Sequence, residues 1–321
     1  MIKGAAFFIL NVGLAAAASG SSSKRGLVFV PNSTYPQDNQ IWVQAGSDLT
    51  WYYNYQDIPS PAYTSIAQST FEFVPMMWGL NASDPDSDSF YKKVTQIISN
   101  RQINITHVLS YNEPDASVNG GSDISPEDGA RGWVANMIPL QKLGIKAGLP
   151  ACTGQPYGLT WTQEFLSNCS SLISNSTHTA NCTFDFMPVH WYDNFAGLES
   201  HINQRLSYWP NTTIWVTEFA YANQDLKDTL DFYNEAIPWL DNNTSVERYS
   251  YFGAFRSQNS NVGPNAAFLN RAGALTDIGS WYLGGSKTNV DPESSSSLAP
   301  HFSPPRIFVG ISLSLGLLLT I

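Results

Sequence analysis

Eight short apolar, β-rich runs alternate with helix-like segments between residues 26 and 283, and this alternation restricts the possible folds more than any other feature. Several runs are almost continuously hydrophobic, as strands buried on both faces of a parallel sheet must be. The expected strands are 26–30, 49–55, 71–78, 106–111, 146–152, 184–191, 213–218 and 248–255. Eight strands that alternate with helices predict an α/β protein with a single (β/α)8 TIM barrel over residues 25–283.

Helical signals occupy the intervals between these strands. Phe90, Val94 and Ile97 recur at helical spacing, and Ser125-Pro126-Glu127-Asp128 is typical of a capped helix start. Further helices are expected at 160–174, 197–209, 226–240 and 266–282.

Three prolines argue against regular strands at three positions of the predicted barrel. Pro75, Pro150 and Pro188 fall inside expected strands, where proline removes a donor from the hydrogen-bond ladder. In a barrel they must lie at strand ends or bulges. A doubly wound open sheet is the alternative.

Both ends of the chain resemble targeting segments. Residues 1–20 combine Lys3, an apolar run and a small-residue stretch, the pattern of a secretory signal peptide. Residues 307–321 are uncharged and follow a stalk at 284–306 that we expect to be disordered. Small residues, a spacer and a hydrophobic tail predict a GPI anchor, with the tail removed and attachment at Ser295. The alternatives are attachment within 284–286 or a short membrane anchor.

Sequons and cysteines agree with export. We expect glycans on the sequon asparagines, although adjacent Asn242 and Asn243 are not expected to be modified together. The sequons begin at Asn32, Asn81, Asn104, Asn168, Asn175, Asn181, Asn211, Asn242 and Asn243. Cys169 and Cys182 bracket a polar loop and are predicted to form a disulfide, which leaves Cys152 as a buried free thiol.

The composition narrows the class of ligand. Only 13% of residues are charged and the formal net charge is -10, which excludes a nucleic-acid binder with a basic face. Because the chain is also rich in Trp and Tyr, it suits a neutral ring-shaped ligand such as a sugar. Neither a P-loop nor Gly-x-Gly-x-x-Gly occurs, and His190 has no second His at ligand spacing. We therefore expect no cofactor and no metal.

Two glutamates follow hydrophobic runs directly. Glu113 ends the fourth expected strand and Glu218 ends the seventh. In a barrel the carboxyl ends of the strands form the active-site face, so the two carboxylates should meet there. Glycoside hydrolysis needs such a pair.

Polar and aromatic residues at other strand ends are candidate sugar contacts, because rings stack on sugars and polar groups bind hydroxyls. They are Asn54, Tyr55, Trp78, Asn112, His190, Tyr192 and Tyr221. For Trp51, Tyr53 and Trp215 core packing is at least an equal interpretation.

Four motifs carry a family resemblance. Residues 52–55 (YYNY), 111–115 (YNEPD), 190–192 (HWY) and 217–219 (TEF) resemble glycoside hydrolase family 128, the fungal alkali-sensitive-linkage type of glycosyl hydrolase catalytic core. The resemblance spans about residues 25–282. Tyr55 stands where members often have Trp, and the loop 170–181 is longer than usual.

The resemblance implies a retaining β-1,3-glucanase, with Glu113 as acid/base and Glu218 as nucleophile. Asn112 would hold the sugar 2-hydroxyl, and the carboxyl groups would lie about 5–5.5 Å apart. We therefore expect a secreted, GPI-anchored, monomeric enzyme that acts on cell-wall β-glucan. A wall-glucan-binding protein without turnover and a transglycosylase are the alternatives.

Overall fold

The computed structural model describes residues 22–101, 103–118 and 120–296. The expected signal peptide (1–20) and hydrophobic tail (307–321) lie outside these residues. Within the described part, every helix is too short or too polar to cross a membrane.

The strands are short and pair in parallel, which gives an α/β fold. Three sheets form, in the orders β1-β2-β3, β4-β5 and β6-β7-β8. Isolated parallel bridges join them: Met76 with Leu109, Gly148 with Phe186, and Arg25 with Tyr249. The last of these brings the first strand beside the last. The strands are β1 (Gly26–Val28), β2 (Trp51–Tyr53), β3 (Glu72–Phe73), β4 (His107–Val108), β5 (Lys146–Ala147), β6 (Met187–Trp191), β7 (Ile214–Phe219) and β8 (Val246–Tyr251).

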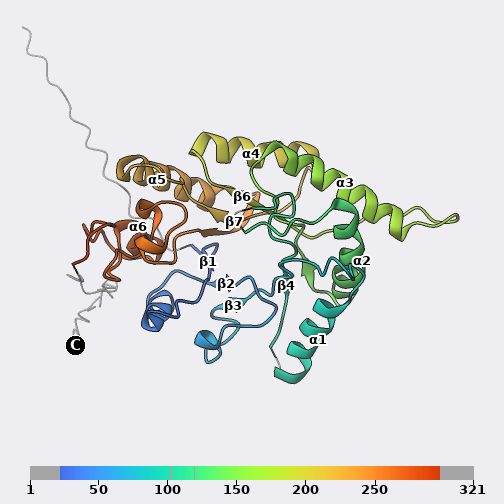
Figure 1. Cartoon of the computed structure of the whole chain (residues 1–321), viewed down its shortest axis with the longest axis horizontal. Coiled ribbons are helices and arrows are strands. Elements are labelled where there is room, and N and C mark those ends of the chain that lie inside the picture. Colours follow the sequence, from blue (N-terminus) through green and yellow to red (C-terminus); the bar gives the residue numbers. More distant parts are fainter. Residues whose placement is uncertain (1–21, 102, 119, 297–321) are drawn as a thin grey trace, which may run out of the picture.

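Helices α1 to α5 lie around the outside of the strands (Figure 1). Two 3-10 helices, η1 (Pro36–Val43) and η2 (Pro61–Tyr63), take the place of helices after β1 and β2. Two more, η3 (Ser257–Asn259) and η4 (Pro264–Ala266), follow β8. The α-helices are α1 (Ser89–Arg101), α2 (Pro126–Lys142), α3 (Pro156–Ile173), α4 (Phe195–Tyr208), α5 (Leu226–Asn242) and α6 (Asp277–Tyr282).

The helix signal at Ser125 is confirmed, whereas the expected helix 266–282 is too long. The Ser125 side chain caps α2 by accepting a hydrogen bond from Asp128 N. Within the expected helix 266–282, only residues 277–282 (α6) form an α-helix. Leu269 instead pairs with Arg256 and with Leu275, and Gly273 turns the chain with a φ of 88°. Extended pairing therefore replaces helix before Thr276, which caps α6.

The prolines lie where a parallel sheet tolerates them. Pro75 and Pro150 follow the ends of β3 and β5. Pro188 is inside β6, directly before a register shift between Val189 and His190. The missing donor therefore lies beside an irregularity in the ladder.

The first part of the expected stalk is not disordered. Backbone N–H groups of Thr288 and Asn289 donate to the Asp277 carboxylate at 2.8 and 2.7 Å. Ser257 donates to the Pro292 carbonyl, and Asn270 donates to the Ser296 carbonyl at 3.1 Å. Specific polar contacts thus hold residues 286–296 against the fold, which composition alone does not reveal.

Two predictions about the cysteines are confirmed. Cys169 and Cys182 form a disulfide with their Cα atoms 5.6 Å apart, and Cys152 is a buried free thiol.

A second cluster of buried side chains, rich in aromatic rings, packs between the strands. Trp51, Phe186 and Trp215 pack there, and the Phe186 and Trp215 rings are stacked with centroids 4.0 Å apart. Trp51 and Trp215 are therefore core residues. A solid interior separates the two ends of the strands.

A buried cation ties the first strand to the last turn of α5. The fully buried Arg25 lies 3.0 Å from Asp48 and 3.4 Å from Asp241, and its Nε donates to the Tyr249 hydroxyl at 3.0 Å. This network holds the two ends of the strand order together.

Replacing Arg25 by Met leaves both carboxylates near a buried site without their cation. We expect a loss of about 3–5 kcal/mol in the free energy of unfolding, measured by urea denaturation. Removing the cation leaves the two carboxylates without a compensating charge at a partly buried position. Lys92→Met is the control, because Lys92 of α1 forms an exposed ion pair with Asp88, the residue before that helix. Its loss should change the free energy of unfolding little. Equal effects of both changes would contradict this role.

Candidate active site

The two predicted glutamates meet at the carboxyl ends of the strands. Glu113 directly follows Asn112, which forms a parallel bridge with Ala151, and Glu218 is the fifth residue of β7. Together with His190 of β6, they place three ligand atoms within 4.8 Å of one another. The strands thus bring together carboxylates that are 105 residues apart in the chain.

Irregular backbone surrounds these residues. Glu113 and Tyr55 adopt the left-handed region, with φ values of 41° and 58°. Register shifts occur next to His190 in β6 and between Val216 and Phe219 in β7. Such strained backbone conformations cost free energy, and bulges change the direction in which side chains point. Both features are common at functional sites. Here they surround the carboxylate pair.

Three tyrosine hydroxyls surround the Glu218 carboxylate. Tyr55 donates to Oε1 at 2.7 Å, Tyr53 donates to Oε1 at 3.2 Å, and Tyr192 donates to Oε2 at 2.5 Å. Burial, together with the charge of Glu218, raises the pKa of each tyrosine well above its ordinary value. The hydroxyls therefore keep their protons and remain donors. Because an ionised carboxylate only accepts hydrogen bonds, they match that form.

Glu113 has a sparser environment. Its side chain is 12% exposed, and its Oε1 lies 3.0 Å from Nδ1 of the buried His190. The same nitrogen lies 3.6 Å from Oε2 of Glu218. Burial opposes protonation of His190, but the negative charges of Glu218 and Glu113 outweigh it and raise the His190 pKa. One imidazole therefore links both carboxylates.

The other predicted contacts divide into two groups. Asn112 donates to the Gly120 carbonyl at 3.0 Å, while its buried Oδ1 has no partner among the described residues. The backbone N–H of Asn112 donates to the carbonyl of Trp78, whose side chain is 41% exposed. Asn54 instead closes its own turn by donating to the Ile58 carbonyl, and Tyr221 packs against Phe232 of α5.

The role of Tyr53 goes beyond the core packing that its sequence context suggested. Its hydroxyl also donates to the Thr217 carbonyl at 3.0 Å, so it holds both the Glu218 side chain and the preceding peptide. Strand periodicity does not reveal this role, because β2 ends at Tyr53 and the left-handed backbone of Tyr55 turns its side chain back toward the same carboxylate.

The same triad has the composition of a metal-ligand group, but its geometry fits a hydrogen bond. Two carboxylates and one imidazole lie within reach of a common ion. The 3.0 Å separation between His190 Nδ1 and Glu113 Oε1 is ordinary hydrogen-bond length. We therefore interpret the contact as proton sharing.

Fold and site together define a class of protein. The parallel strands place the Glu113 and Glu218 carboxylates close together at their carboxyl ends. Glu218 accepts hydrogen bonds from three hydroxyls, whereas Glu113 has one histidine partner. This is the catalytic equipment of carboxylate-pair glycoside hydrolases.

Comparison with known proteins gives the family. Residues 26–282 match the model of the glycosyl hydrolase catalytic core. The chain therefore belongs to this family, and its relatives place it among the glycoside hydrolases of family 128.

One curated relative is alkali-sensitive linkage protein 1 of Schizosaccharomyces pombe, 30% identical over 272 residues. The match covers 83% of this chain but only 45% of that protein. The chain thus spans less than half the length of this relative.

Solved structures share the fold. A curdlan-specific exo-β-1,3-glucanase of family 128 from Blastomyces gilchristii, in complex with glucose, is 27% identical with a TM-score of 0.62, over 82% of this chain and 99% of that one. An oligosaccharide-binding protein of family 128 from Cryptococcus neoformans is 20% identical with a TM-score of 0.59, over 83% and 95%. The fold therefore occurs in both enzymes and binding proteins.

The raised pKa of His190 predicts a pH-dependent stability. Protonated His190 contributes stability that is fully present below its unfolded pKa of about 6.5 and is lost as the pH rises through the folded pKa. We expect His190→Gln to lower the urea unfolding midpoint more at about pH 6 than at about pH 9. The exposed His178→Gln serves as the control, and an equal loss at both pH values would refute the charge linkage.

Proposed function

We propose that the protein hydrolyses β-1,3-glucan with retention of anomeric configuration. The observation that carries the proposal is the close carboxylate pair, with its nearest ligand atoms within 4.8 Å. Retaining enzymes hold their carboxyl groups about 5–5.5 Å apart, whereas inverting enzymes need about 6.5–9.5 Å to admit a water molecule. The choice of β-1,3-glucan comes from the family and from the named activities of its members.

The unequal surroundings of the pair suggest the division of roles. Glu218, oriented by three hydroxyl donors, is the nucleophile that attacks the anomeric carbon. Glu113, with its partly exposed side chain and single histidine partner, protonates the leaving oxygen and then deprotonates water. When Glu218 forms the glycosyl ester its charge disappears, so His190 then interacts mainly with the Glu113 carboxylate.

Two further residues are suited to hold the sugar. The unpartnered, buried Oδ1 of Asn112 can accept a hydrogen bond from the 2-hydroxyl. The exposed ring of Trp78 offers a stacking face near the same position.

The proposal includes a closed (β/α)8 barrel. It is supported by the parallel bridges between successive sheets and by the bridge between Arg25 and Tyr249. Closure would direct the carboxyl ends of all eight strands to one active-site mouth.

We further propose a secreted, monomeric glycoprotein that is GPI-anchored through Ser295 at the cell surface, where it meets wall glucan. Ser295 is exposed, as are the sequon asparagines 81, 104, 175, 181, 211 and 242. The disulfide fits an oxidising compartment.

Two alternatives use the same fold. A glucan-binding protein without turnover is favoured by the structural similarity to an oligosaccharide-binding protein. A transglycosylase would intercept the same glycosyl ester with a sugar instead of water. The presence of both Glu113 and Glu218 favours catalysis over binding alone.

Removal of the nucleophile tests the enzyme directly. We expect Glu218→Ala to reduce sugar release from laminarin by at least about 10³-fold, because the covalent route is lost. With an activated β-glucoside, added azide should restore turnover in the variant and give an α-glycosyl azide, as retention requires. Glu164→Gln, an exposed change on α3, should leave the activity unchanged. Binding of laminarin without release by the wild type would establish the binding-protein alternative.

The hydroxyl donors on Glu218 provide a graded test. We expect Tyr55→Phe to reduce kcat by about tenfold to a hundredfold, since a hydrogen bond to a charged group contributes about 1.5–3 kcal/mol. Tyr63→Phe also removes one buried hydroxyl, but one that donates to the Asn39 carbonyl, and it should affect stability and not kcat. Steady-state kinetics on laminari-oligosaccharides would separate the two.

A further inference from the structure

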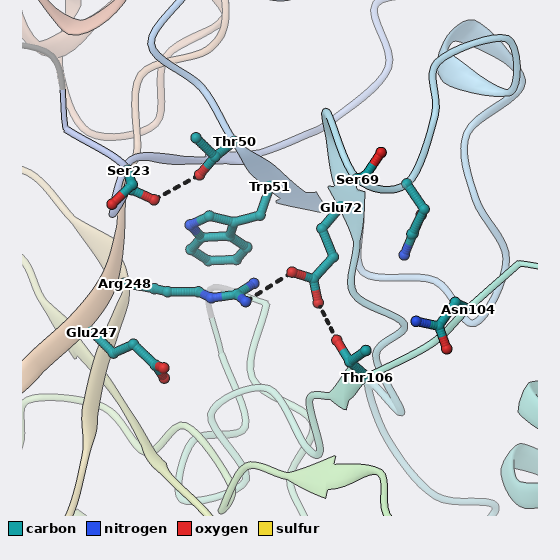
Figure 2. Close-up of a pocket in the computed structure, with 10 residues that line it drawn as sticks. Ser23, Thr50, Trp51, Ser69, Glu72, Asn104, Thr106, Glu247 and Arg248 are labelled. Atoms are coloured by element: carbon teal, nitrogen blue, oxygen red, sulfur yellow. Dashed lines mark hydrogen bonds and ion pairs between the residues drawn. The ribbon is translucent and has the colours of Figure 1, made fainter.

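A cavity lies at the opposite end of the strands from the carboxylate pair. It has a volume of about 570 Å³, within the range of pockets for small organic ligands. Figure 2 shows Trp51, Ser69, Glu72, Asn104 and Arg248 around it.

The lining residues lie at the amino ends of the strands. Thr50 precedes β2, Glu72 opens β3 and Thr106 precedes β4, while Glu247 and Arg248 are near the start of β8. The aromatic cluster between the two ends separates this cavity from Glu113 and Glu218. A glucan chain bound at the carboxylates therefore does not explain it.

The charges of the cavity are already paired. Arg248 lies 2.7 Å from Glu72 and over the Trp215 ring at 4.3 Å. Glu72 also accepts a hydrogen bond from Thr106, and Glu247 accepts one from the Trp215 indole at 2.7 Å. Because Arg248 and Glu72 compensate each other and Glu247 is held by an indole N–H, the charged groups are already engaged. The cavity therefore suits a neutral ligand with hydroxyl and amide groups that can donate to the carboxylates.

Asn104 opens the sequon Asn104-Ile105-Thr106 at the rim of this cavity. Its side chain is exposed and takes part in no hydrogen bond among the described residues, and its amide nitrogen is directed toward the cavity in Figure 2. By contrast, the amide nitrogens of Asn32 and Asn242 donate to Asp38 and to the Pro238 carbonyl. The attachment atom of Asn104 makes no hydrogen bond among the described residues and points at a polar cavity.

We propose that Asn104 carries an N-linked glycan whose first N-acetylglucosamine residues occupy this cavity. This inference depends on the proposed secretion. In the attachment step the Asn104 amide nitrogen loses a proton and forms a bond to C1 of the sugar, and the pyrophosphate of a polyprenyl-linked oligosaccharide donor leaves. The covalent tether gives the sugar a high effective concentration at the cavity, so weak contacts suffice to hold it there.

The cavity matches an acetamido sugar. Side-chain hydroxyls of Ser23, Thr50 and Ser69 can donate and accept hydrogen bonds, and the Glu247 carboxylate can accept them. The docked sugar would cover the ion pair between Glu72 and Arg248 and protect it from water. The glycan would then stabilise the end of the fold that takes no part in catalysis.

The full chain, secreted from a yeast host, provides the test. Mass spectrometry first measures occupancy at each sequon. Native protein is then treated with endoglycosidase H, which cuts between the two core N-acetylglucosamines. We expect trimming at Asn104 to be about tenfold slower than at Asn175, equivalent to about 1.4 kcal/mol of docking free energy. Asn175 is the control because it is exposed on the loop after α3 and is not among the residues that line this cavity.

Ser69→Trp should fill the exposed side of the cavity without removing the sequon. We expect it to raise the trimming rate at Asn104 to that at Asn175, and Asn104→Gln to lower the thermal midpoint more than Asn175→Gln. Modification of Asn175 but not Asn104, equal native trimming rates, or no effect of Ser69→Trp would each overturn the inference. Secreted protein unmodified at every sequon would refute the glycoprotein proposal as well, while loss of laminarin activity would leave the docked glycan unaffected.

Discussion

The carboxylate of Glu218 is 6% exposed, and the geometry of the site depends on meeting its need for hydrogen bonds. A buried carboxylate is costly unless donors replace the water that it loses. Strand β2 and its extension supply the donors Tyr53 and Tyr55, and the residue after β6 supplies Tyr192. His190 of β6 adds an electrostatic contact at 3.6 Å. The left-handed Tyr55 and the register shifts in β6 and β7 are the backbone distortions found beside these side chains.

The two ends of the strands handle charge in opposite ways. At the carboxyl ends, two glutamates share one histidine, which leaves negative charge that the hydroxyls must disperse. At the amino ends, Glu72 is paired with Arg248 and His107, and despite its burial these partners lower its pKa to about 2. The carboxyl end thus places two carboxylates around one imidazole, whereas at the amino end Glu72 has cationic and hydrogen-bonding partners of its own. The aromatic cluster between them allows both within a small fold.

Much of this arrangement could be read from the sequence, and the exceptions have physical reasons. Buried parallel strands leave hydrophobic runs, so Glu113 and Glu218 stood out as the first polar groups after them. The role of Tyr53 was hidden because a tyrosine has the same pattern whether its hydroxyl faces a carboxylate or a backbone carbonyl. Short-range patterns also failed at 266–276 and 286–296, where distant partners such as Arg256, Asp277 and Ser257 determine the backbone.

If Ser295 carries the proposed lipid anchor, the segment after α6 limits how far the domain can lie from the membrane. Ser257 donates to the Pro292 carbonyl, so the chain stays attached to the body of the fold until shortly before the exposed Ser295. A lipid attached at Ser295 would therefore leave almost no slack between domain and bilayer. The domain would then lie against the membrane with a restricted orientation. Its active site could reach only the thin layer of cell wall next to that surface. Under the proposed anchoring, glucan would have to reach the enzyme at that surface.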